Sequence, residues 1–317
     1  MSKTSTLAAG VDTGKHLLDV ALEGTSARLQ VANAVAGYKE LVAWLKRQRV
    51  RRVGIEASGG YEKAVVRHLR AADFIVVVFQ PVQVRAYAMF QLCRAKNDRI
   101  DAALIAACTA AHDSVRAAPD PRFEALAERL TLLEQIEEDL ARAKIRREGF
   151  REARQQALLD QEIKRLKAVR KSELLALTVE LRSHDDLARR FDLLQSIPGL
   201  GERTALCLVI RMPELGQISR EEAAALAGVA PFDDDSGQRH GPRRICGGRG
   251  RVRKSLFAAA LPAAFRWNSQ LIVFYRRLSA AGKSHKLALI ACARKLLIYA
   301  NTVLARGTPW TQTPAAT

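Results

Sequence analysis

Residues 1–115 alternate between short apolar runs and longer amphipathic stretches. The apolar runs are bounded by turn residues, which is typical of β-strands, and they cover residues 6–12, 16–23, 27–34, 52–57 and 74–80. Apolar positions at helical spacing predict helices over 37–49, 59–72, 82–93 and 99–112. Three consecutive strands followed by alternating helices and strands predict an α/β or α+β sheet with helical cover.

The predicted order of elements, β-β-β-α-β-α-β-α, is that of a ribonuclease H-like fold. We therefore assign residues 1–118 to one such domain, which ends before the prolines at positions 119 and 121.

Residues 122–182 carry a continuous helical pattern. They contain no proline, and Gly149 is their only glycine. Apolar residues recur at spacings of three to five, at positions 123, 126, 130, 133, 136 and 140 and again at 163, 166, 169, 174, 177 and 181. The pattern predicts a long helical hairpin or coiled-coil arm over residues 119–189, which would serve either as a spacer or for dimerisation.

Residues 190–317 predict a second, mostly helical domain. Its segment 197–201, IPGLG, joins two amphipathic helices and resembles a helix-hairpin-helix. In that motif, Gly199, Gly201 and the following helix N-terminus would offer backbone N–H groups to a phosphate. The plainer alternative is a tight helix turn. Five aromatic residues further along are spaced as helical core, with stacking on bases as the alternative: Phe257, Phe265, Trp267, Phe274 and Tyr275.

The overall charge narrows the choice of partner. Lys and Arg number 51 against 33 Asp and Glu, for a formal charge of +18, which favours binding to a polyanion. No apolar run reaches about 18 residues, so no membrane span is expected. The five cysteines are isolated, which predicts neither a zinc site nor disulfides and favours the reducing cytoplasm.

Four acidic residues are the strongest chemical signal. Asp12 and Glu56 each end an apolar strand, and Asp98 and Asp101 lie three apart at the start of a helix. Each alone could serve a turn or a helix cap. Together they supply the oxygen ligands that hard cations prefer, and two Mg²⁺ ions about 4 Å apart catalyse phosphoryl transfer in many enzymes. We therefore predict a metal-dependent enzyme acting on nucleic-acid phosphates.

A basic segment follows Ser236. It contains no acid from Gln238 to Leu261, and its cations are Arg239, Arg243, Arg244, Arg249, Arg251, Arg253 and Lys254. Guanidinium groups match phosphate geometry, and the glycines at 241, 247, 248 and 250 would let backbone approach it. We predict a nucleic-acid surface here, with a solvated loop as the alternative. Taken locally, Ser236 is a turn serine.

These motifs together resemble a known family. The segments GVDTGK, GIEASGGYE and KNDRIDA, then IPGLG, AGVAPFDDDSG, RRICGGRGRVRKSLF and AAGKSHKLALIACARKLL, are similar to those of the RuvC-like DEDD insertion-sequence transposases now called bridge-RNA-guided recombinases. The resemblance covers about residues 5–305, in the family's domain order. Asn97 stands where the family often has Thr, and Gly14 varies from a common Ser.

The resemblance implies roles for particular residues. Asp12, Glu56, Asp98 and Asp101 would be catalytic and hold Mg²⁺, and Ser236 would be a catalytic serine that forms a phosphoserine link to DNA. It also implies target and donor DNA, a structured noncoding guide RNA and a homo-oligomer, either dimer or tetramer, acting at the bacterial nucleoid.

Three other functions remain as alternatives. A structure-selective endonuclease of the Holliday-junction-resolvase kind would use the four acids and water, without a serine nucleophile. An actin-like ATPase would need a second Asp-Gly hairpin, which the sequence lacks. A non-catalytic nucleic-acid-binding protein with a decayed site is disfavoured, because all four acids are present.

Overall fold

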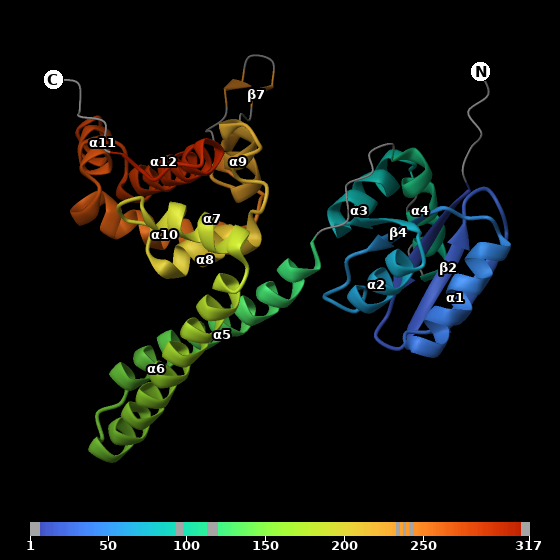
Figure 1. Ribbon diagram of the computed structural model, residues 1–317, viewed down its shortest axis with the longest axis horizontal. Coiled ribbons are helices and arrows are strands. Elements are labelled where there is room, and N and C mark those ends of the chain that lie inside the picture. Colours follow the sequence, from blue (N-terminus) through green and yellow to red (C-terminus); the bar gives the residue numbers. More distant parts are fainter. Residues whose placement is uncertain are drawn as a thin grey trace. The chain divides into compact units, whose positions relative to one another are not determined.

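The computed structural model describes residues 7–92, 98–112, 120–232, 235–236, 239–240 and 244–311 (Figure 1). Side chains are described throughout these ranges except at 98–100, 235–236 and 239–240. Two compact units make up the chain, Met1–Pro119 and Asp120–Thr317. The helices predicted as a separate arm thus fall in the same unit as the C-terminal helices.

A five-stranded mixed sheet forms the centre of the first unit, in the order β3-β2-β1-β4-β5. The strands are β1 (Ala8–Thr13), β2 (Leu17–Leu22), β3 (Arg28–Ala32), β4 (Arg52–Glu56) and β5 (Ile75–Phe79). The first three pair antiparallel, and β4 runs parallel to β1 and β5. Each strand lies within two residues of its predicted range, and the mixed α/β class is confirmed.

Helices cover both faces of this sheet. They are α1 (Val35–Arg47), α2 (Lys63–Ala71), α3 (Pro81–Phe90) and α4 (Asp98–Ala111). Helices α1 and α2 pack on the face that carries Val11 and Ile55, whereas α4 packs on the opposite face through Ile105 and Cys108. Helix α2 begins later than predicted because Gly59 and Gly60 adopt positive φ values of 73° and 110° in a turn.

Two long antiparallel helices open the second unit, α5 (Pro121–Gly149) and α6 (Ala153–Arg182). Near their connection, the Arg147 side chain pairs with Asp160 at 3.0 Å, and a small core around Leu140 and Leu166 lies between them. Their other halves contribute to the main core of the unit. Figure 1 shows the pair extending from the remaining helices.

The rest of this unit is a helical body with short strand pairs. Its helices are α7 (Asp185–Gln195), α8 (Glu202–Arg211), α9 (Arg220–Ala227), α10 (Gly250–Pro262), the π-helical turn η1 (Ala263–Trp267), α11 (Ser269–Ala280) and α12 (His285–Arg306). The strands are β6 (Pro231–Phe232), β7 (Asp235–Ser236), β8 (Arg239–His240) and β9 (Arg244–Ile245).

Helix α12 lies in the core of the helical body, where Leu289, Cys292 and Leu296 are fully buried. Among the described residues it is the one helix long and apolar enough to cross a membrane, and half of its apolar window is buried inside this unit. Core helices meet the same criteria, so this finding gives little support to a membrane span.

The prediction that the late aromatic residues are core is wrong for two of the five. Phe257, Phe274 and Tyr275 pack against the core, but Phe265 is 50% exposed and Trp267 is 63% exposed. The physical reason is local. Pro262 lies at the end of α10, and the following residues form a π-helical turn, which shifts the side-chain register relative to a regular α-helix.

Candidate active site

Asp12 and Glu56 lie at the ends of two adjacent parallel strands. The parallel register pairs Val11 of β1 with Ile55 of β4, so the two acids follow one residue later on each strand. Side chains alternate along a strand, so both carboxylates take the face opposite Val11 and Ile55. Neighbouring strands lie about 4.8 Å apart, and both acids are half-buried. The sheet thus brings together residues 44 positions apart in sequence, as predicted.

Two glycines let α4 lie directly on that same face. A Cβ added to Gly10 would overlap the backbone of Ala102 and Ala106, and one added to Gly54 would overlap the Thr109 side chain. Asp101, half-buried near the start of α4, immediately precedes the residue that covers Gly10. The helix therefore carries Asp101 on the face of the sheet that holds Asp12 and Glu56. Of Asp98, the described part is the backbone, at the first residue of α4.

Hydrogen bonds join the loops that follow β1 and β4. Thr13, which is 4% exposed, contacts the Ser58 hydroxyl and donates to the Glu56 carbonyl at 3.4 Å. The Asn33 side-chain amide donates to the carbonyls of Gly14, at 2.9 Å, and Tyr61, at 3.2 Å. These contacts fix the backbone directly after each acid, which restricts where Asp12 and Glu56 can point.

Asp19 is a further acid on this face that sequence reasoning missed. It lies opposite Asp12 in the antiparallel register of β1 and β2, and its Oδ1 accepts a hydrogen bond from Gln30 Nε2 at 2.9 Å. The two residues share a face because opposed residues of an antiparallel pair always do. Only the strand register reveals this proximity, and the spacing of Asp19 in the sequence gives no signal for it.

The donor chemistry of the face suits a hard divalent cation. Asp12, Glu56 and Asp101 offer carboxylate oxygens, the ligands that Mg²⁺ takes. Among the described side chains, no group of three or more His, Cys, Asp or Glu could by itself hold a metal ion. The Asp98 side chain lies outside that set, so the predicted group of four is not tested as a whole.

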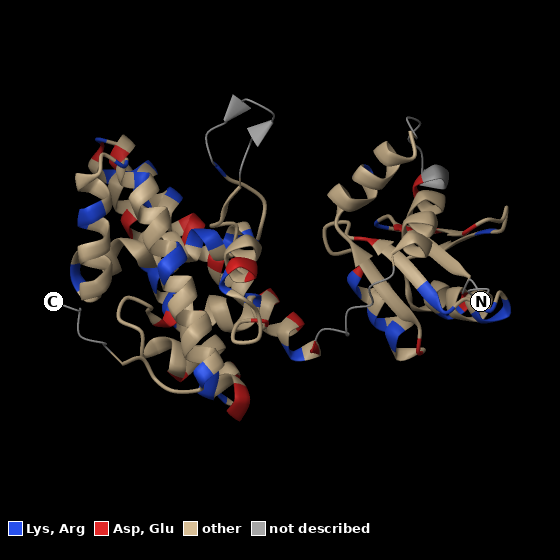
Figure 2. Ribbon diagram, turned by 90° about the horizontal axis from the view of Figure 1, so that it is seen from above, with Lys and Arg blue, Asp and Glu red and all other residues tan. Residues whose placement is uncertain are grey.

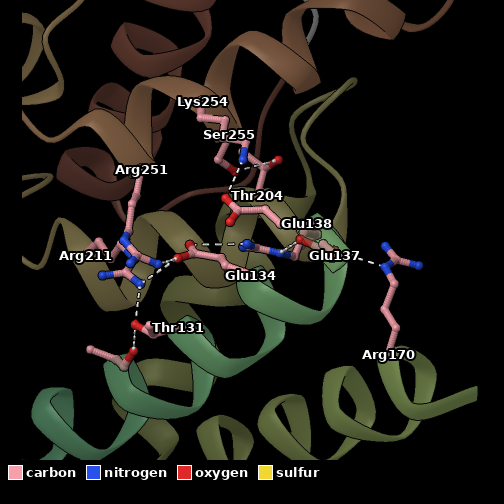
Figure 3. Close-up of polar contacts among 12 residues, drawn as sticks. Thr131, Glu134, Glu137, Glu138, Arg170, Thr204, Arg211, Arg251, Lys254 and Ser255 are labelled. Carbon is pink, nitrogen blue, oxygen red and sulfur yellow. Dashed lines mark hydrogen bonds and ion pairs between the residues drawn. The ribbon is translucent and has the colours of Figure 1, made fainter. Parts of the chain in front are cut away.

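Two cations predicted to contact nucleic acid pair with acids of α5 (Figure 3). Arg251 pairs with Glu134, whose side chain is 12% exposed and which also receives Arg203 and Arg211 at 3.2 and 2.9 Å. Lys254 Nζ lies 2.7 Å from Glu138 Oε1, and its hydrogen bond lowers the pKa of Glu138. These contacts hold α8 and α10 against α5.

Two more arginines of the basic segment bind the chain's own oxygens. Arg249 donates to both carboxylate oxygens of Glu214, at 2.5 and 2.9 Å, and to the Arg211 carbonyl. Arg253 donates to the carbonyls of Gly228 and Gly247 at 3.3 and 2.7 Å. A Cβ on Gly248 would overlap the Gly228 backbone, so this glycine serves a close crossing of two chain segments.

The remaining residues of the basic segment are only partly described. Arg244 is exposed on β9, opposite Phe232. Arg239 and Ser236 are described as backbone alone, paired with each other across β7 and β8. Arg243 lies outside the described residues. The predicted roles of Ser236 and of Arg239 therefore stay predictions.

The turn predicted to bind phosphate connects α7 to α8. Gly199 has a φ of 98°, and an added Cβ would overlap Ala263 of η1, so it serves a tight turn and a close packing contact. Gly201 is exposed and precedes α8, whose first residue, Glu202, accepts a hydrogen bond from Thr178 at 2.8 Å. An acid at this helix N-terminus disfavours a phosphate there.

Two family models match the chain. A model of the DEDD type from IS110 elements, described as transposase, matches residues 9–162. A second, described as the transposase IS116/IS110/IS902 family, matches residues 191–276.

Two of the curated relatives align with almost the whole chain. The pilin gene-inverting proteins of Moraxella bovis and Moraxella lacunata are each 26% identical over 322 residues, covering 98% of both chains. An uncharacterized 43.6 kDa protein of insertion element IS110 from Streptomyces coelicolor is 31% identical over 36% of this chain and 29% of its own.

Two solved structures of Thermus thermophilus RuvC are also similar to part of the chain. One, in complex with a Holliday junction substrate, is 14% identical with a TM-score of 0.27 and covers 32% of this chain and 91% of its own. The other is 18% identical with a TM-score of 0.22 and covers 36% of this chain and 84% of its own.

Proposed function

We propose, from the premise that this chain belongs to the IS110-type transposases and is a DNA transposase or recombinase, that it cuts and rejoins DNA through a phosphoserine intermediate. One observation carries the metal-dependent half of this proposal. Asp12 and Glu56 end adjacent parallel strands, on the same sheet face to which two glycines admit the helix of Asp101. Strand-end carboxylates under a helix are a suitable scaffold for divalent cations acting on phosphate.

The acids of the first unit would act on the scissile phosphate. Asp12, Glu56, Asp98 and Asp101 would hold Mg²⁺, as two ions. When bound, the metal supplies charge neutralisation at the phosphate and at the leaving oxygen. The hydrogen bonds of Thr13 and Asn33 would keep the Asp12 and Glu56 carboxylates oriented, which limits the reorganisation that the reaction requires.

Ser236 would supply the nucleophile, a role carried over from the family that the chain resembles. Its Oγ attacks phosphorus, a P–Oγ bond forms, and the P–O3′ bond breaks. The serine proton leaves to a base, and the departing O3′ takes up a proton as a free 3′-OH. In strand exchange, a 3′-OH attacks the phosphoserine, which restores a phosphodiester and releases Ser236. A serine hydroxyl is a weak nucleophile unless a metal or a base assists it.

The proposed partners follow from the same resemblance. DNA would be bound as target and donor, and a structured noncoding RNA would select both by base pairing, while the protein contacts backbones. The charge of +18 supports binding to nucleic acids in general. The chain would act as a homo-oligomer, a dimer or tetramer in which the α5–α6 pair serves as a dimerisation arm, in the cytoplasm at the nucleoid.

Trapping the covalent intermediate tests the mechanism. A nicked DNA substrate, incubated with the purified protein, its locus transcript and Mg²⁺, should give a protein–DNA adduct that survives denaturation. Ser236→Ala should abolish both the adduct and cleavage, whereas Asp73→Asn, at an exposed acid, should leave both unchanged. Cleavage by Ser236→Ala at the wild-type rate would refute the serine mechanism and favour a resolvase-like hydrolysis by water.

A further inference from the structure

Three aromatic rings from three helical elements form an exposed cluster on the second unit. The Phe265 ring of η1 lies 4.8 Å from that of Tyr275 on α11 and 6.3 Å from that of His285 on α12, measured between centroids. Tyr275 and His285 are in edge contact at 5.9 Å and share a hydrogen bond of 2.7 Å between Oη and Nδ1. The bond holds two of the rings in a fixed arrangement.

The cluster lies at the edge of the hydrophobic core, because Tyr275 packs against that core while the other two rings are exposed. Phe265 is 50% exposed, His285 is exposed, and Trp267 of the same π-helical turn is 63% exposed. Phe265 contacts the other two rings of the cluster and leaves half of its own surface exposed to solvent. An exposed ring supported by others is suited to stack with a planar ligand.

The charge around the cluster selects the ligand class. Each of its rings is followed in sequence by an exposed cation, respectively Arg266, Arg276 and Lys286. None of these three forms an ion pair with a residue that the structure describes. On the adjoining Phe274, the Lys295 ammonium lies 4.6 Å and the Arg277 guanidinium 5.3 Å from the ring centroid. Rings bordered by cations suit bases joined by phosphates.

The sequence after Asp235 carries basic residues but no acidic ones. No Asp or Glu occurs after Asp235, whereas Lys and Arg recur up to Arg306. Figure 2 shows Lys and Arg along the helices of this unit. A protein partner would find no acid of this segment with which to pair, while a polyanion meets only attractive charge. The absence of acids therefore favours nucleic acid over a protein as the occupant.

We propose that Phe265, Tyr275 and His285 form a stacking platform for an unpaired base of single-stranded DNA or RNA, with Arg266, Arg276 and Lys286 binding the flanking phosphates. The proposal deepens the proposed function and rests on it for the choice of nucleic acid. It is separate from the acidic face and from Ser236, and it needs no metal. Unpaired strands occur wherever a duplex is opened or cut.

Binding to single-stranded oligonucleotides tests the platform without any cleavage. Fluorescence anisotropy is measured in EDTA, with DNA and RNA strands of one sequence in separate arms. Phe265→Leu keeps an apolar side chain but removes the ring, and should weaken binding about tenfold, the loss expected for one stacked base. Phe265→Trp keeps a ring and should bind as the wild type does. An effect in either arm supports the platform and identifies its nucleic acid.

Two controls make the test decisive. Val82→Ala truncates a 69%-exposed residue of α3 and should bind normally. An oligonucleotide carrying abasic sites should bind the wild type and Phe265→Leu equally. The platform is refuted if Phe265→Leu and Phe265→Trp bind alike, or if abasic strands show the same loss. These measurements involve no cleavage and do not depend on Asp12. Failure of the proposed cleavage mechanism would therefore leave the binding result valid.

Discussion

At the scale of single residues, strand parity places Asp12 and Glu56. Side chains alternate along a strand, so Val11 and Ile55 enter the core under α1 and α2 while their successors take the opposite face. Moving either strand by one residue would turn its carboxylate into that core. The acidic face therefore depends on strand register, which long-range pairing sets.

Asp12→Asn removes one negatively charged oxygen ligand for Mg²⁺ and keeps the volume of the side chain nearly constant. We expect DNA cleavage to fall by about 10³-fold, because charge stabilisation by a bound metal is worth several kcal/mol. Stability should change by less than about 1 kcal/mol, since Asp12 is only half-buried. Single-turnover cleavage and thermal unfolding measure the two effects. Asp73→Asn is the matched control, because Asn tolerates its φ of 68°. Residual cleavage above a tenth of the wild-type rate would contradict the assignment.

Asn33→Asp tests whether the joined loops orient the acids. The substitution keeps the oxygen that accepts from Tyr38 at 2.6 Å but removes the donors to Gly14 and Tyr61. We expect the Mg²⁺ concentration for half-maximal cleavage to rise about tenfold, with about 1–2 kcal/mol lost from stability. Tyr38→Phe removes only the hydrogen bond from the Tyr38 hydroxyl to Asn33, and it should leave the Mg²⁺ requirement unchanged. An unchanged requirement in Asn33→Asp would limit Asn33 to a role in folding.

At the scale of elements, the contact of α4 with the sheet is the critical one. Gly10→Ala would place a methyl group against the Ala102 and Ala106 backbone, which cannot yield as a flexible side chain would. We expect a loss of about 1–3 kcal/mol from overpacking and a larger loss of cleavage, because α4 carries Asp98 and Asp101. Denaturant unfolding and cleavage of the same preparation measure both. Gly149→Ala, whose Cβ would meet nothing within 4 Å, should preserve both.

The α5 acids give a prediction for the helical unit. Glu134 is 12% exposed and holds three arginines, so Glu134→Gln should destabilise the unit by about 3 kcal/mol, as expected when buried charges lose their partner. Glu138→Gln breaks an exposed pair and should leave the free energy of unfolding nearly unchanged. Urea unfolding of both variants provides the comparison. Equal losses would mean that burial does not decide the strength of these pairs.

The sequence predicts elements well where one rule dominates. Short apolar runs located the five strands of the first unit but none of the short strands β6 to β9, and strand-end positions placed Asp12 and Glu56 on one edge. It missed Asp19 because only pairing with β2 brings that acid beside Asp12. It assigned Phe265 to the core because a regular helix was assumed, whereas the π-helical turn exposes it. It gave no sign that Arg249 pairs with Glu214, because the two residues lie far apart in sequence.

At the scale of the whole molecule, net charge overstates what is available to phosphate. Part of the basic segment is neutralised by the chain's own acids, as with Arg249 on Glu214 and Arg251 on Glu134. Cations without such partners among the described residues occur near the ring cluster, at Arg266, Arg276 and Lys286. Nucleic-acid binding by the second unit should therefore depend on a subset of its cations.

The salt dependence of duplex DNA binding can identify that subset. Each phosphate contact contributes about 0.9 to the slope of log K against log salt concentration. Arg244 is exposed, so Arg244→Gln should lower the magnitude of the slope by about 1. Arg249→Gln should leave the slope unchanged and lower stability instead, because Arg249 is held by both oxygens of Glu214. The same fall in slope for both variants would show that Arg249 exchanges its carboxylate for phosphate on binding, as the sequence alone had predicted.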